Sequence, residues 1–308
     1  MSKTTLSLFI DDTHFVPHGQ FRAVVDFCLA QGVCGKVSLI AGLGGEPTKL
    51  AMGQAPSPEE WEFLDQLKRI AAGGMDIHME MMTHAKLWDF GEQKMRSSGP
   101  CEGAWLYDPA VSQAEYQAYI GAILDHAARY GITINGISVP GCICDDCRKM
   151  WEVLAQRGQS QLSDTAIAAV LALATQGKWG VPAVAIYSDE ADAENPTRVI
   201  ARQDDLCVFD ARLNLSAQDL IGFDGKHDSD YYISADGTCG KIPELVNAGA
   251  PHFLFCAHWF DMNPTKPAGW HAFQDIILRI NSLLGDRIEW ARPSDIGARL
   301  HAASRRTA

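Results

Sequence analysis

The stretch LSLFIDDTHF, Leu6 to Phe15, is the strongest indication of the fold of this chain. The mostly apolar run from Leu6 to Ile10 has the length and composition of a buried β-strand. The run ends on two adjacent carboxylates, Asp11 and Asp12, and such a pair is costly to desolvate unless a cation or hydrogen bonds compensate it. The stretch therefore predicts a strand whose carboxyl end carries either a simple loop cap, which Asp often forms, or a catalytic or metal-binding site.

Composition and charge narrow the class of protein. The chain has 308 residues, of which 47% are hydrophobic and 21% charged, and this suits one large α/β domain with a full core. Its formal net charge of -12 argues against nucleic acid or an anionic membrane surface as a partner. No apolar window resembles a secretory signal or a membrane span. We therefore expect a cytoplasmic protein acting on a small-molecule or oligosaccharide substrate, and the sequence leaves its oligomeric state open.

Strand and helix patterns alternate along the rest of the chain. Strand patterns lie at residues 6–10, 36–42, 76–84, 132–141, 182–188, 205–211 and 251–259. Among the helices between them, the clearest start is at Ser57, where Pro58 and Glu60 complete a capping box with proline at the first helical position. The alternation predicts βα units around a parallel sheet. We expect a single barrel domain over residues 1–308, with a long loop excursion at 85–111 that is a candidate lid.

Polar residues stand at the ends of several of these strands. In a parallel α/β barrel the active site lies at the carboxyl ends of the strands, where Asp12, Glu80, His84 and His258 are found. Carboxylate and imidazole side chains are ligands that zinc accepts, and three protein ligands with one open position is its catalytic arrangement. One residue of the aspartate pair could bind the ion while the other acts as general base.

Two further histidines and a cysteine cluster are additional candidates for metal binding. His78 alternates with Glu80 in its strand, and it is either a reserve ligand or a hydrogen-bonded histidine packed inside the barrel. His14 is either a second reserve ligand or a loop residue. Cys142, Cys144 and Cys147 have the C-x-C-x-x-C spacing of a possible second zinc site, with reduced thiols that cap a helix, or a redox thiol, as the alternatives.

Tryptophans near the expected mouth of the barrel are candidates for substrate binding. Trp259 follows the last strand and Trp88 lies in the excursion after the third strand, so both rings could stack on a sugar. The alternative is that they are packing residues, as most lone aromatic residues are.

Four motifs give the sequence a family resemblance. The segments LFIDD, GMDIHMEMMTHAKL, GISVPG and FLFCAHW resemble, in order, the landmarks of the polysaccharide deacetylase (NodB-homology) superfamily. The resemblance implies a distorted (β/α)7 barrel that hydrolyses an acetamide or an ester with the help of a divalent metal ion. It also implies that Asp11 is the catalytic base, that Asp12 and His84 are metal ligands, and that His258 is the general acid.

The chain departs from the family pattern at two positions and would be a divergent member. Glu80 stands where members carry a histidine, and the added negative charge would either weaken the Lewis acidity of the metal ion or shift the preference of the site toward harder cations. Ser138 stands where members carry an arginine that orients the catalytic aspartate, so Asp11 loses its expected partner.

These observations predict a metal-dependent hydrolase, with Zn²⁺ as the first choice of ion, that removes an acyl (acetyl) group from a carbohydrate or a related small amide or ester. Two alternatives remain open. One is a non-catalytic carbohydrate-binding protein on a degenerate deacetylase scaffold. The other is a metal-free barrel glycosidase that uses Asp189 or Glu190, although those carboxylates also suit a solvated loop.

Overall fold

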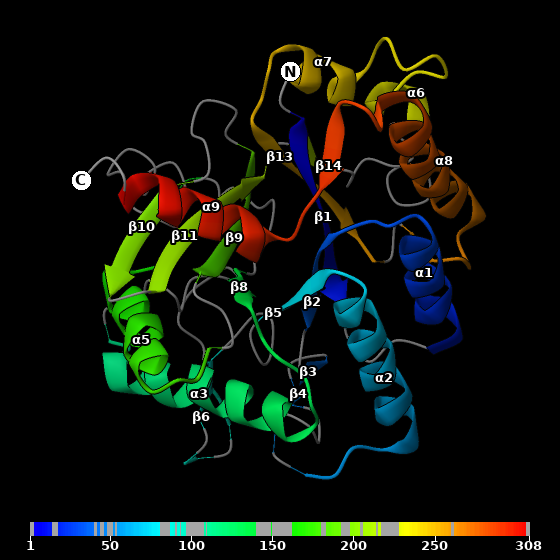
Figure 1. The fold of residues 1–308 in the computed structure, drawn as a ribbon. Coiled ribbons are helices and arrows are strands. Elements are labelled where there is room, and N and C mark those ends of the chain that lie inside the picture. The colour runs from blue at the N-terminus through cyan, green and yellow to red at the C-terminus, as the bar shows by residue number, and fades with distance from the viewer. Residues whose placement is uncertain are drawn as a thin grey trace.

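A sheet of ten strands forms the centre of the structure. The strands are β1 (Thr4–Thr13), β2 (Gly35–Leu39), β5 (Met75–Met79), β8 (Gly136–Ser138), β9 (Ala183–Ala191), β10 (Arg198–Gln203), β11 (Leu206–Leu213), β12 (Leu215–Ser216), β13 (His252–His258) and β14 (Ile288–Trp290). Their order is β10-β11-β9-β8-β5-β2-β1-β13-β12, and β14 also pairs with β1 (Figure 1). Two small antiparallel pairs lie apart from it, β3 (Gly42–Leu43) with β4 (Glu46–Pro47), and β6 (Leu87–Asp89) with β7 (Lys94–Arg96).

The coordinates are a computed structural model. They describe residues 3–13, 18–39, 42–43, 46–47, 52, 54–80, 87–89, 91–92, 94–96, 108, 110–139, 149, 162–179, 183–191, 198–203, 206–213, 215–216, 228–259 and 262–305.

The strands β1, β2, β5, β8, β9, β11 and β13 pair in parallel from neighbour to neighbour. The sheet curls so that β11 and β13 approach each other without pairing: Phe209 of β11 and Cys256 of β13 are buried in the same small apolar cluster. A curled parallel sheet with helices around it confirms the predicted distorted (β/α)7 barrel.

Helices surround the sheet as the alternating pattern predicts. They are α1 (His18–Ala30), α2 (Pro58–Ala72), α3 (Gln113–Arg129), α5 (Asp164–Thr175), α6 (Ser229–Tyr232), α7 (Lys241–Asn247), α8 (Pro267–Leu284) and α9 (Pro293–Arg305). The capping box at the start of α2 forms as expected, with the Ser57 side chain accepting from the Glu60 backbone N–H at 3.2 Å. The buried face of α2 includes Leu64 and Leu67, which pack in the main core.

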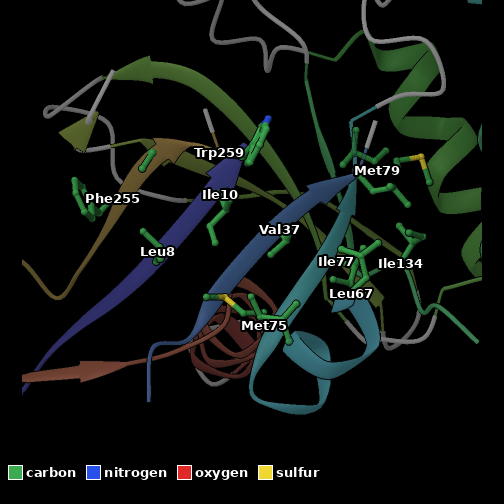
Figure 2. Close-up of a cluster of buried hydrophobic side chains, with 14 of the residues drawn as sticks. Leu8, Ile10, Val37, Leu67, Met75, Ile77, Met79, Ile134, Phe255 and Trp259 are labelled. Carbon is green, nitrogen blue, oxygen red and sulfur yellow. The ribbon is translucent and has the colours of Figure 1, made fainter. Parts of the chain in front are cut away.

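Alternation along the strands separates an apolar outer face from an inner face that carries polar as well as apolar side chains. Leu8, Ile10, Val37 and Ile77 are fully buried and belong to the main core, which includes apolar side chains of the surrounding helices (Figure 2). The residues between them in sequence face the interior of the barrel, where buried polar groups are unusually frequent. They include Ser7, Asp11, Lys36, Ser38, Asp76, His78 and Ser138.

The C-terminal helix α9 lies across β9, β10 and β11 (Figure 1). Its Ile296 joins Phe209 in the small apolar cluster, and a side chain at Gly297 would come within 2.2 Å of the Phe209 ring. The first turn of α9 is tied to β5, because the Asp76 carboxylate accepts from the Ser294 backbone N–H at 2.8 Å and from its hydroxyl at 2.9 Å.

Asp76 is expected to make the stability of the protein depend on pH. Burial raises the pKa of this carboxyl from 3.8 to about 6, although the hydrogen bonds from Ser294 and the charge of Arg292 lower it. The folded state therefore binds this proton more tightly than the unfolded state, and the contribution of Asp76 to the free energy of unfolding should fall as the pH rises from about 4 to about 6. Asp76→Asn should remove this loss, which amounts to about 3 kcal/mol. Urea unfolding of both proteins at several pH values checks this, and a stability difference that does not change with pH would contradict it.

Some predicted elements differ from the structure in extent. The strand expected at 76–84 ends at Met79, and the one expected at 132–141 is described only over Gly136–Ser138. Within the excursion at 85–111, the described residues include the antiparallel pair β6–β7. None of the helices in the described ranges is long and apolar enough to cross a membrane.

Candidate active site

The polar strand ends of β1, β5 and β13 meet at the carboxyl end of the sheet. The register of the parallel pair β1–β13 places Asp11 directly beside His258, and the Trp259 backbone N–H donates to the Asp11 carbonyl oxygen at 2.9 Å. Glu80 follows the last residue of β5, and its backbone N–H donates to the Leu39 carbonyl at 2.9 Å. The structure thus brings Asp11, Glu80 and His258 to the same end of the sheet.

A β-bulge at the end of β1 changes the direction of the aspartate pair. Ile10 pairs with Val37 and Thr13 pairs with Leu39, so two residues of β1 lie opposite the single residue Ser38 of β2. Asp12 has a φ of 58° and lies in the left-handed region, and it is the only non-glycine residue with positive φ in the described ranges. Such a conformation costs energy, and aspartate adopts it more readily than most residues. The bulge lets two consecutive side chains, which would alternate in a regular strand, reach one site.

Asp12 and His258 form the more exposed part of this site. Asp12 Oδ2 lies 3.6 Å from His258 Nε2, and their side chains are 23% and 11% exposed, respectively. The Asp12 backbone N–H donates to Glu80 Oε2 at 3.1 Å, so the Glu80 carboxylate holds the bulged backbone in place. The arrangement brings two carboxylates and an imidazole to the mouth of the barrel.

Asp11, in contrast, is buried. Its Oδ1 atom accepts from the Lys36 ammonium group, and also from the Ser38 hydroxyl at 2.7 Å. Its Oδ2 atom accepts only from the Cys256 thiol, at 3.1 Å, among the residues that the structure describes. Because a thiol is a weak donor, Oδ2 keeps most of its capacity to accept a proton.

Lys36 is the site residue that the sequence analysis missed. It is the second residue of β2, is 0% exposed, and its ammonium group also donates to Ser138 Oγ at 2.7 Å. The expectation that Asp11 lacks a partner because Ser138 replaces an arginine is therefore wrong, since a cation reaches both residues from a different strand. The signal available in the sequence was a lysine at the start of the otherwise mostly apolar strand pattern at 36–42.

His78 lies deeper in the barrel than the mouth. Its side chain is fully buried, its ring packs edge-on to Phe9 with 6.3 Å between the centroids, and burial together with the charge of Lys36 holds its pKa well below the usual range. Neither ring nitrogen has a hydrogen-bond partner among the described residues. His78 is thus packed inside the barrel, as the alternative to the reserve-ligand hypothesis predicts, but without the hydrogen bond that alternative assumed.

The two tryptophans proposed for substrate binding are buried. Trp259 is 6% exposed and Trp88 is 7% exposed, and both belong to the main core. Figure 2 shows Trp259 close to Ile10 at the end of β1. A sugar needs an open ring face, so these positions correct the prediction of substrate binding in favour of the packing alternative.

Several predicted site residues lie outside the described residues. They are His14, His84, Cys142, Cys144 and Cys147. Asp189 and Glu190 belong to strand β9, but their side chains are not described. Their predicted roles stay predictions.

The described side chains of the site do not by themselves provide the ligands that a metal ion needs. A catalytic zinc site uses three protein ligands, and within the described ranges no three His, Cys, Asp or Glu side chains are placed to hold an ion. Asp12 and His258 converge, whereas one Glu80 oxygen is already used by the Asp12 backbone. The described residues alone therefore do not make up the predicted site, which also requires His84.

Comparisons with known proteins give only distant likenesses. No protein-family model matches the chain, and no curated protein matches it. Among solved structures, it is similar to the peptidoglycan deacetylase PdaC from Bacillus subtilis, with 10% identity, a TM-score of 0.45, and coverage of 99% of this chain and 95% of that one. A CE4 family pseudoenzyme from Bacillus anthracis has 10% identity and a TM-score of 0.43, with coverage of 96% and 65%.

A third similar structure is a putative cellobiose-phosphate cleavage protein from Enterococcus faecalis. It has 11% identity and a TM-score of 0.49, with coverage of 96% of this chain and 100% of that one. The similar structures thus include deacetylases, the class that the sequence resemblance names, as well as a pseudoenzyme. Such distant likenesses carry no information on activity, so the function of this chain rests on its own side chains.

Proposed function

We propose that this protein is a hydrolase that removes an acyl group, in the first place an acetyl group, from a carbohydrate or a related small amide or ester. One observation carries the proposal. At the mouth of the barrel, an imidazole and a carboxylate, His258 and Asp12, lie 3.6 Å apart beside a second carboxylate, Asp11, that is held in place by a buried cation. These groups can accept and donate the two protons that hydrolysis of an amide requires.

Asp11 is proposed as the general base. Hydrogen bonds from Lys36 and Ser38 fix Oδ1, which leaves Oδ2 to accept the proton of a water molecule that attacks the acyl carbon. The side chain is 3% exposed, so only a molecule as small as water is proposed to reach it. The attack forms a C–O bond and gives a tetrahedral intermediate with negative charge on the former carbonyl oxygen.

His258 is proposed as the general acid. Its Nε2 atom lies 3.6 Å from Asp12 Oδ2, at the mouth of the barrel. When the intermediate collapses, the C–N bond breaks and the leaving nitrogen takes the proton from Nε2. The products are a carboxylic acid and a free amine, or an alcohol when the substrate is an ester.

A screen for acyl release tests this function. The purified protein is incubated with N-acetylated and O-acetylated mono- and oligosaccharides and with a small aryl acetate, and the released acetate is measured. We expect acetate from at least one of these substrates, and none when Asp11 and His258 are both replaced. Saturable binding of a saccharide without any acyl release would favour the carbohydrate-binding alternative.

A divalent ion is part of the proposal, with Asp12, Glu80 and His84 as its ligands and Zn²⁺ as the first choice. When bound, it would stabilise the negative charge of the reacting oxygen. Asp12 and Glu80 are already neighbours, because the Asp12 N–H donates to Glu80 Oε2.

Metal analysis of protein purified without chelators should find about one divalent ion per chain. Asp12→Ala, Glu80→Gln and His84→Ala should each lose most of it, because each removes one of three ligands, whereas the surface variant Asp125→Ala should keep it. Full metal content in the three site variants would show that the ion is bound elsewhere. An ion that disappears only in Cys147→Ser would assign it to the cysteine cluster.

A further inference from the structure

We propose that Lys36 is the positioning residue of this site: its ammonium group fixes the orientation of the Asp11 carboxylate toward the attacking water. The inference rests on the proposed function, in which Asp11 is the base. It goes beyond that function because Lys36 touches no substrate and comes from a strand that contributes no reacting group.

The geometry around Lys36 supports a fixed orientation. The ammonium group donates to Asp11 Oδ1 and to Ser138 Oγ, and it lies 4.9 Å from the centroid of the Phe9 ring. Partners on β1 and β8 therefore restrain it from two sides of β2. Because Ser38 donates to the same oxygen of Asp11 from two residues further along β2, the carboxylate cannot rotate without breaking a bond to this strand.

The burial of Lys36 and Asp11 explains why a charged side chain is needed next to the Asp11 carboxylate. Lys36 is 0% exposed and Asp11 is 2% exposed, so neither charge is compensated by solvent. Removing one partner of a buried ion pair leaves an uncompensated charge and is strongly destabilising, whereas removing both is often tolerated. Neutral donors such as Ser38 and Cys256 can orient the carboxylate, but they cannot balance its charge.

Two measurements test the proposal, one on stability and one on turnover. In urea unfolding, Lys36→Met and Asp11→Asn should each lower the midpoint, and the double variant should be more stable than either single variant. The surface pair Lys178 and Asp125 provides a matched control, because it is an ion pair between partly exposed side chains and should show no such recovery. If Lys36→Met does not fold, the double variant with Asp11→Asn can still be measured, and a folded double variant would show the expected recovery of stability.

In turnover, Lys36→Met should lower kcat by roughly 10²-fold with KM unchanged, because the substrate still binds but the base is misplaced. Ser38→Ala, which removes a neutral donor to the same oxygen, should cost less. A folded Lys36→Met with the kcat of the wild type would overturn the positioning role while leaving the proposed function intact. If the wild type releases no acyl group from any substrate, the proposed function fails and the positioning role, which rests on it, fails with it. Recovery of stability in the double variant would then show only that Lys36 and Asp11 form a buried ion pair.

Discussion

Asp11→Asn is expected to lower turnover by roughly 10²–10⁴-fold, because an amide cannot take the proton from the attacking water. The substitution preserves the size of the side chain, and its carbonyl oxygen can still accept from Lys36 and Ser38. Substrate binding should therefore change little, and the loss should appear in kcat rather than in KM.

The loss of activity must be separated from a loss of folding, since Asp11→Asn leaves the buried Lys36 charge uncompensated and should cost about 3 kcal/mol of stability. The double variant with Lys36→Met removes both charges, so it should regain stability and stay inactive. Steady-state kinetics with circular dichroism on all three variants distinguishes these effects. Near-normal turnover by the folded double variant would exclude Asp11 as the base.

His258→Ala is expected to lower the hydrolysis of an amide by roughly 10²–10⁴-fold and to have a much smaller effect on an activated aryl ester. An amine leaves only after it is protonated, whereas a phenolate leaves without a proton. The proposed acid, His258, is therefore needed for hydrolysis of the amide and nearly dispensable for hydrolysis of the aryl ester. Rates on both substrates, measured with the same preparation, check this difference.

His252 offers a matched control for His258, because it lies at the opposite end of the same strand, β13. His252→Ala should leave the rates on both substrates close to those of the wild type. If His258→Ala slows both substrates equally, the residue acts in binding or folding rather than as a proton donor. If it slows neither, it has no part in the reaction.

The local pattern of the sequence was sufficient for the elements of the fold. The apolar run before Asp11 became β1, the capping box at Ser57 became the start of α2, and the run before His258 became β13. These features depend on neighbouring residues: side-chain alternation in a strand and backbone hydrogen bonds in a first helical turn are satisfied within a few positions. The sequence expected the strand of Glu80 to continue to residue 84, whereas β5 ends at Met79, directly before Glu80.

The partners of those residues depended on the tertiary structure. The bulge at Asp12 arises from a register shift between β1 and β2, and it decides which aspartate is buried and which one faces His258. Lys36 meets Asp11 only because the two strands are neighbours in that register. The burial of Trp259 likewise follows from packing in the core.

By itself, then, the sequence determined the parallel α/β class and seven strands of the central sheet, whereas β10, β12 and β14 were not predicted from it. Only the tertiary structure decided that Asp11 is paired with a buried lysine and that Asp12 is turned toward an imidazole. The physical reason is that strand register and the curl of a sheet are set by contacts between residues far apart in the chain, and a local pattern contains no information about them.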